Sequence, residues 1–186
     1  QGRRLNKVLA NTLTCNSIYL RQIMQQYAAG KSDDLAYRLA RRNAHNADAA
    51  LSTTLANMLM EPGYFRKEAD VGFRFLVLSH TLLSYLSGLG AHRETQLPAD
   101  VREHLIEGAG VKLATSIDEI AQGLASKSAI AIQSDEEEAL ANELEQMPDE
   151  IDEGQRLVQT QLALICRQLG PLRTLAAHLI KDTSEN

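Results

Sequence analysis

Residues 40–58 have the sequence ARRNAHNADAALSTTLANM, and the spacing of their apolar side chains predicts how the chain folds. One side of a helical wheel is apolar and mostly small, with Ala40, Ala44, Ala47, Leu51, Leu55 and Met58. Small side chains along one face let a second helix approach closely. The stretch therefore predicts a long amphipathic helix packed against its neighbours, and hence an all-α fold.

The preceding residues continue the helical pattern. Apolar positions recur at helical spacing and predict a first helix over residues 3–29. Gly30 is expected as its C-cap, and Ser32 as the N-cap of a second helix that continues to Met60. Because the connection is so short, these two helices are predicted to be antiparallel neighbours.

The rest of the chain also has a helical pattern. We expect helices over residues 65–90 and 98–125, a short acidic helix capped by Ser134, and a last helix that begins near Asp149. Gly170 and Pro171 should kink or break the last helix, since proline removes a backbone donor. No repeat or Gly/Ser/Pro-rich linker divides the chain. Residues 1–186 are therefore predicted to form one domain, an up-and-down helical bundle of long antiparallel helices in five or six segments.

Composition supports a folded helical chain. Hydrophobic residues make up 44% and charged residues 23%, with no tryptophan and only three phenylalanines. The core must therefore consist mainly of Leu, Ile, Val and Ala. Cys15 and Cys166 form no CxxC pair, which indicates free thiols in a reducing compartment.

Charge is unevenly distributed along the chain. The formal net charge is −5, yet residues 1–42 carry eight Lys/Arg and two acids, whereas residues 135–153 carry ten acids and no base. The chain as a whole offers no basic stripe for nucleic acid, so we expect no such partner. The acidic run is interpreted as a solvated helix and loop; the alternative is docking to a basic surface such as the N-terminal helix of a neighbouring subunit.

Residues 71–91, VGFRFLVLSHTLLSYLSGLGA, are long enough to span a bilayer. However, Arg74 and His80 lie inside this segment and Asp70 immediately precedes it. A central helix buried on all sides explains the pattern better. His80 is then expected to be a hydrogen-bonded core residue.

Five polar residues beside the apolar face of residues 40–58 are the candidate ligand-binding set: Arg41, Arg42, His45, Asn46 and Asp48. Arginines can hold a carboxylate bidentately, and a histidine paired with an aspartate can change charge near neutral pH. An anionic small molecule, such as an aromatic acid, would suit them. The ordinary interpretation is a solvated helix face whose members are neighbours at helical spacing.

Signatures of catalysis and metal binding are missing from the sequence. It has no phosphate-binding loop, no dinucleotide motif and no nucleophile elbow, and its five histidines show no ligand spacing. We expect no enzyme, cofactor or metal site. An enzyme would need polar groups to converge, for example His45 and Asp48 with His80 or Glu68.

Three long strings carry a resemblance to known proteins: residues 19–63, 65–94 and 149–182. They resemble the soluble C-terminal part of YccS/YhfK-type members of the fusaric-acid-resistance (FUSC) family of bacterial inner-membrane proteins. The resemblance implies a longer protein in which membrane helices precede this domain. It also implies a link to the export of aromatic carboxylic acids, and it supplies no catalytic residues.

From the resemblance we expect a cytoplasmic domain of an inner-membrane efflux transporter of a bacterium. It would act in assembly, gating or substrate sampling, and would pack against its own transmembrane domain and a second copy. Basic residues Arg3, Arg4 and Lys7 would then lie near the anionic leaflet, or serve only solubility. The alternative is a free-standing helical ligand-sensing or adaptor domain.

Overall fold

The computed structural model describes residues 2–29, 34–61 and 66–184, and over these ranges the chain forms helices and no strand. The predicted all-α bundle is confirmed. Its elements are α1 (Gly2–Ala29), α2 (Leu35–Met60), α3 (Arg66–Ala91), α4 (Ala99–Arg102), a π-helical segment (Glu103–Gly110), α5 (Val111–Ser126), α6 (Asp135–Glu145) and α7 (Glu153–Ser184).

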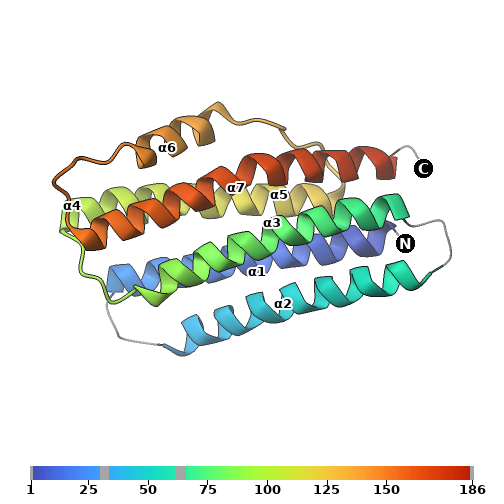
Figure 1. The fold of residues 1–186 in the computed structure, drawn as a ribbon, viewed down its shortest axis with the longest axis horizontal. Helices are drawn as coiled ribbons and strands as arrows, with labels where there is room; N and C mark the ends of the chain where they lie inside the picture. The colour runs from blue at the N-terminus through green and yellow to red at the C-terminus, as the bar shows by residue number, and fades with distance from the viewer. Residues whose placement is uncertain (1, 30–33, 62–65, 185–186) are drawn as a thin grey trace.

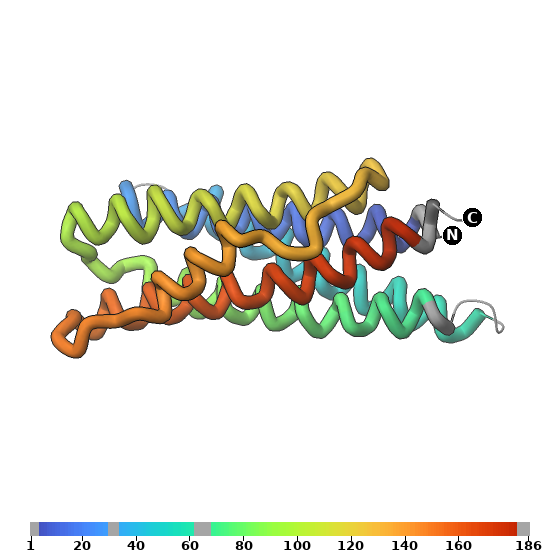
Figure 2. The backbone as a smooth tube through the Cα atoms, turned by 90° about the horizontal axis from the view of Figure 1, so that it is seen from above, coloured from blue at the N-terminus to red at the C-terminus, as the bar shows by residue number. Residues whose placement is uncertain are grey.

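Four long helices form the centre of the bundle. Figure 2 shows α1 beside α5 in one layer and α3 beside α7 in the other, and the layers meet through α1–α3 and α5–α7 contacts. Helices α1, α2, α3 and α5 alternate in direction, as predicted for α1 and α2, and α6 leads the chain back so that α7 runs parallel to α5 (Figure 1). Two helices lie outside this centre, α2 against α1 and α3, and α6 against α7 on the opposite edge.

The core consists of apolar side chains from every long helix. In α2 the predicted apolar face is buried: Ala40, Ala44, Ala47, Leu51 and Leu55 are at most 5% exposed. This face meets α3 closely, because a Cβ built on Gly72 would lie only 2.4 Å from Leu55 Cδ2. Small residues on both helices thus let α2 pack tightly in the groove between α1 and α3.

The helix predicted over residues 98–125 is continuous from α4 through the π-helical segment to α5. Pro98 directly precedes its first turn, where a missing N–H is harmless. The π-helical segment ends at Gly110, and a Cβ there would lie 2.1 Å from Met24 Sδ of α1. Glycine at this position therefore lets α1 pass close to the wider turn.

Predicted boundaries hold for some helices and fail for others. Ser134 caps α6 as predicted, accepting a hydrogen bond from the Glu137 amide at 3.2 Å. Gly30 and Ser32 lie outside the described residues, and α2 begins at Leu35. The last helix begins at Glu153, later than predicted, because residues 146–152 form a non-helical connection from α6 with a turn at residues 149–150.

Of the predicted kink or break at Gly170 and Pro171, the break does not occur. Helix α7 continues through Pro171 to Ser184. Proline removes one backbone hydrogen bond, the one to the Arg167 carbonyl, but Pro171 is exposed and water can hydrate that carbonyl. Packing of the long apolar face of α7 on both sides of Pro171 outweighs the loss of this single bond.

The prediction that residues 71–91 form a helix buried on all sides is also wrong. Helix α3 packs against α1, α2 and α7, but it exposes one face that includes Asp70, Arg74, Val77 and His80. The polar residues that interrupt the apolar pattern lie on this face. Among the described helices, none combines the length and apolarity that crossing a membrane requires.

Replacing Leu55 with alanine tests the packing of α2. Leu55 is fully buried, whereas Leu59, one turn further along the same helix, is 55% exposed. We expect Leu55→Ala to lower the free energy of unfolding by about 2–5 kcal/mol, because it leaves a cavity. The matched Leu59→Ala change should cost about 0.5 kcal/mol or less. Denaturant unfolding measures both, and equal losses would contradict the observed orientation of α2.

Candidate functional site

The five predicted ligand-binding residues all lie on α2, and four of them face solvent. Arg41, Arg42, His45 and Asn46 are exposed, whereas the Asp48 side chain is only 16% exposed and turns toward α3. Helix α2 lies at the edge of the bundle and packs only its opposite face against α1 and α3 (Figure 1). The set therefore forms an exposed polar surface, which we call the α2 polar strip.

Helix α3 adds a residue to the α2 polar strip. His80 Nδ1 lies 2.9 Å from Asp48 Oδ2, within hydrogen-bond distance. The predicted hydrogen bonding of His80 is confirmed, but its predicted core location is wrong, because its side chain is 69% exposed. Glu68, the other residue considered, lies three turns away from His80 on α3, about 18 Å along the helix axis.

Neighbouring groups hold His45 in its neutral form. Partial burial lowers the pKa of its imidazole below the ordinary value, and the positive charge of Arg41 lowers it further. Asp48 opposes this by raising the pKa, and His80 adds to the lowering. At neutral pH His45 is therefore an uncharged donor and acceptor beside a cationic arginine.

This arrangement can recognise an anion but does not enclose one. Arg41 and Arg42 supply positive charge and His45 supplies a hydrogen bond, while one carboxylate oxygen of Asp48, Oδ2, is occupied by His80. Hollows lie elsewhere on the protein, for example one of about 630 Å³ at the end of the bundle near Arg93 and one of about 460 Å³ between α6 and α7. Ligand sites are usually concave, so an anion on this convex face would bind weakly.

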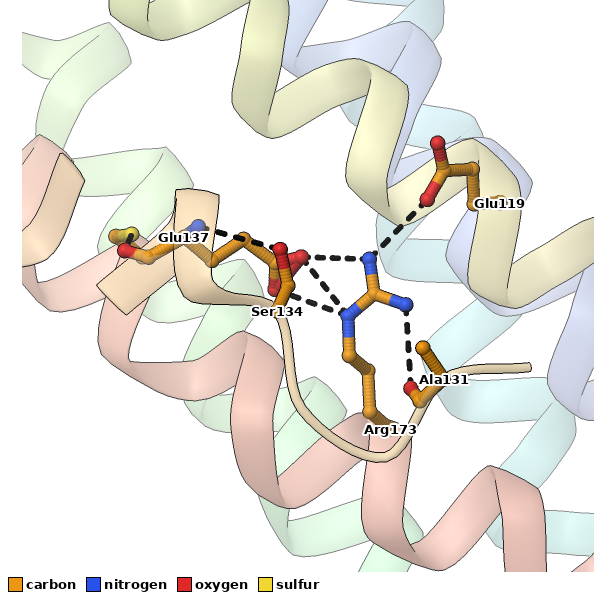
Figure 3. A network of polar contacts seen from close by, with 6 residues as sticks. Glu119, Ala131, Ser134, Glu137 and Arg173 are labelled. Atoms are coloured by element: carbon orange, nitrogen blue, oxygen red, sulfur yellow. Dashed lines mark hydrogen bonds and ion pairs between the residues drawn. The ribbon is translucent and has the colours of Figure 1, made fainter. Parts of the chain in front are cut away.

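A second polar cluster, on α7, was not predicted. Arg173 is only 4% exposed, and its guanidinium connects three elements (Figure 3). Its Nε donates to Glu137 Oε2 of α6 at 2.8 Å, its Nη2 to Glu119 Oε2 of α5 at 3.2 Å, and its Nη1 to the Ala131 carbonyl at 3.4 Å. Arg173 thereby fixes α6 and the preceding loop to the bundle.

The charges in this cluster are well matched. Burial alone would lower the pKa of Arg173, but the hydrogen bonds and negative charges of Glu137 and Glu119 outweigh it, so that the pKa is raised. Arg167, a neighbour on the surface of α7, donates to Glu138 at 2.9 Å and also pairs with Glu145. The acidic run of residues 135–153 is thus partly neutralised by arginines of α7. It is not simply a solvated helix and loop.

Neither cysteine has the properties of a nucleophile. Burial and the negative charge of Glu137 raise the pKa of the Cys166 thiol to about 12. Its Sγ donates to the Glu137 carbonyl at 3.3 Å. Burial also raises the pKa of Cys15. Both therefore remain protonated thiols at neutral pH.

Metal ligands do not gather in the described part of the chain, where no three His, Cys, Asp or Glu side chains could together hold an ion. His104, which follows α4, pairs with Glu143 of α6 at 2.7 Å. This contact gives α6 a further link to the helix that includes α5.

Removing Arg173 should destabilise the protein strongly. We expect Arg173→Met to lower the free energy of unfolding by about 3–5 kcal/mol, because Glu137, with a side chain only 12% exposed, would remain unpaired. Arg167→Met is the matched control on the surface of the same helix, and its effect should be much smaller. Thermal or denaturant unfolding measures both. A similar loss in the two variants would contradict a special role for the buried arginine.

The environment of His45 can be measured by NMR titration of its ring protons. We expect its pKa to lie below 6.5, to rise in Arg41→Gln and to fall in Asp48→Asn, following the charges that surround it. Because the folded state disfavours protonated His45, this residue should make the protein less stable as the pH falls below 6.5. A pKa unaffected by both substitutions would contradict these charge interactions.

Comparison with known proteins gives relatives for about half of the chain. It is 50% identical over 91 residues to an uncharacterized protein of Haemophilus influenzae, and 46% identical over 94 residues to the inner membrane protein YccS of Escherichia coli. An uncharacterized protein ORF2 of Neisseria gonorrhoeae is 33% identical over 87 residues.

These matches span 49%, 50% and 46% of this chain, but only 13%, 13% and 21% of the relatives' own lengths. No family model and no solved structure matches. The first two identities are too high to arise from helical composition alone. Over this half of the chain they confirm the predicted resemblance to YccS-type proteins, whose Escherichia coli member is an inner-membrane protein.

Proposed function

We propose that the chain is a cytoplasmic domain of an inner-membrane efflux transporter of the fusaric-acid-resistance (FUSC) family, acting in assembly, gating or substrate sampling. The observation that carries the proposal is the 46% identity to an inner membrane protein over 94 residues, which are only 13% of that protein. The matched segment is thus a small part of a much longer membrane protein. Its own transmembrane domain and a second copy are the proposed partners.

The placement of the polar side chains favours a role in assembly or substrate sampling over a catalytic role. The polar groups that could have formed a catalytic centre are only partly brought together, since Asp48 meets His80 but Glu68 lies far along α3. Both thiols are held in the protonated form. A helical bundle with an exposed face on α2 is suited to contacts with other parts of an assembly.

Substrate sampling would take place at the α2 polar strip. Arg41 and Arg42 would hold the carboxylate of an aromatic acid, and neutral His45 and Asn46 would offer hydrogen bonds. Asp48 would act indirectly by holding His80 in place. Weak binding suits sampling, because a transporter domain must release its ligand.

A cytoplasmic position is also compatible with the basic start of α1. Arg4 and Lys7 are exposed and could lie near an anionic membrane surface. The alternative function remains a free-standing helical ligand-sensing or adaptor domain. The sequence of the whole gene product discriminates between them, because only the transporter requires hydrophobic spans in the same chain.

Titration of the chain with aromatic carboxylates such as benzoate tests the sampling role. We expect saturable NMR shifts at millimolar concentrations, centred on Arg41, His45 and Asn46, and their loss in Arg41→Ala. Arg21→Ala is the control, since Arg21 is a surface arginine on α1 that already pairs with Asp118 at 2.7 Å. No shifts at the α2 polar strip, or equal loss in both variants, would contradict sampling and leave assembly or gating.

A further inference from the structure

The hollow of about 630 Å³ lies at the end of the bundle where α1 and α3 end and α4 begins (Figure 1). Residues 26–29 of α1, residues 93–97 of the connection after α3, and Arg102 of α4 line it. Its volume is in the range typical of sites for small molecules, about 300–1,000 Å³. We call it the end hollow.

The walls of the end hollow belong to the packed bundle. Tyr27 is only 7% exposed, and its hydroxyl donates to the Leu89 carbonyl of α3 at 2.7 Å. Arg93 Nη1 donates to the Gly90 carbonyl at 3.1 Å, and its guanidinium lies 4.3 Å from the centroid of the Tyr37 ring. These contacts join α1, α2 and α3 beside the end hollow. The end hollow is therefore formed before any ligand enters it.

Arg102 differs from the other covered arginines of the protein. Of the described arginines, Arg93, Arg102 and Arg173 are the least exposed. Arg173 pairs with two glutamates, and Arg93 lies 3.6 Å from a carboxylate oxygen of Asp34. The side chain of Arg102 forms no hydrogen bond or ion pair with any described residue. Its charge is thus partly removed from water and unmatched.

The sequence around Arg102 explains why this charge has no partner. The residues three and four positions away on either side are Pro98, Ala99, Leu105 and Ile106, and none of them is acidic. A charged side chain that is partly removed from water without a partner costs free energy. Because Arg102 lines the end hollow, an anion bound there could supply the missing partner.

Other side chains of the end hollow could bind the same anion. The Thr95 hydroxyl and the Gln96 amide can both donate hydrogen bonds, and neither side chain donates to a described residue. Carboxylate and phosphate oxygens accept hydrogen bonds from such groups and from guanidinium. Glu94 and the carboxyl end of α1 add negative charge that opposes an anion. Affinity should therefore depend strongly on Arg102.

We propose that the end hollow binds a small organic anion whose carboxylate or phosphate group is held by Arg102. A bare ion would leave most of the 630 Å³ unfilled, which favours a ligand with a body beyond its charged group. The α2 polar strip shares no residue with the end hollow. The inference therefore goes beyond the substrate sampling proposed above, and either can hold without the other.

NMR titration with matched charged and neutral probes tests the proposal. Succinate and succinamide share a carbon skeleton, and glucose 6-phosphate differs from glucose by its phosphate. We expect saturable shifts of the Arg102 Nε–H and the Thr95 and Gln96 amides with at least one anion, but not with its neutral counterpart. A response to succinate alone identifies a carboxylate ligand, and a response to glucose 6-phosphate alone identifies a phosphate ester.

Two results of this titration would overturn the proposal. One is the absence of shifts around the end hollow with either anion at about 10 mM, where even a weak specific site is largely occupied. The other is an equal response to the neutral probes, because the proposed contact with Arg102 requires a charged group.

Matched variants test the role of Arg102. We expect Arg102→Gln to weaken binding of the anion about tenfold or more, because it removes charge-assisted hydrogen bonds. Arg74→Gln is the control, since Arg74 is exposed on α3, lies outside the end hollow and also has no ion pair with a described residue. Arg41→Ala, in the α2 polar strip, should leave this binding unchanged. Retained binding in Arg102→Gln, or equal loss in Arg74→Gln, would overturn the proposal.

Thermal unfolding separates a ligand role for Arg102 from a purely structural one, in which its charge serves only the carboxyl end of α1. Without ligand, Arg102→Gln should melt at the same temperature as the unmodified chain or higher, because an unmatched charge is removed. The anion that binds should raise the melting temperature of the unmodified chain but not of Arg102→Gln. A lower melting temperature for Arg102→Gln than for Arg74→Gln, with no effect of either anion, would overturn the proposal.

Discussion

The fold depends on the burial of α1 among its neighbours. Helix α1 is covered by α2 and α3 on one side and by α5 on another, and Leu9, Leu13, Leu20 and Ile23 are fully buried. Because α1 and α3 run side by side, they leave a groove that accepts a single helix face. Helix α2 fills it with alanines and leucines, and its remaining sides must face outward. The exposed position of the α2 polar strip follows directly from this packing constraint.

Two sets of arginines have opposite roles in the molecule. Arg173 is buried, connects α5, α6 and α7, and its charge is fully matched by Glu137 and Glu119. Removal of such a charge from water is costly unless it is paired, so this cluster serves structure and gives α6 a defined position. Arg41 and Arg42 are exposed on a helix at the edge of the bundle. They retain the capacity to meet another molecule, whether a carboxylate or a second copy of the chain.

Local sequence signals predicted the local features of the fold. The apolar face of α2 and the Ser134 cap depend on spacing within one helix, and both are observed. His80 was placed wrongly because the exposed side of α3 depends on how much of it α2 covers. The Arg173 cluster was missed because neither Arg167 nor Arg173 has an acidic residue three or four positions away. Their partners come from other helices, and only tertiary structure brings them together. The role of the α2 polar strip as a ligand site stays a prediction.

The central proposal is that this bundle is a cytoplasmic part of an inner-membrane protein. The most direct measurement attaches a topology reporter after α7 in the whole gene product and compares two reporters in living cells. A fluorescent protein that folds only in the cytoplasm should be bright in the membrane fraction, and a phosphatase active only outside the cytoplasm should be inactive. An active phosphatase and a dark fluorescent protein would place the bundle on the other side of the membrane. Recovery of the reporter outside the membrane fraction would contradict the account altogether.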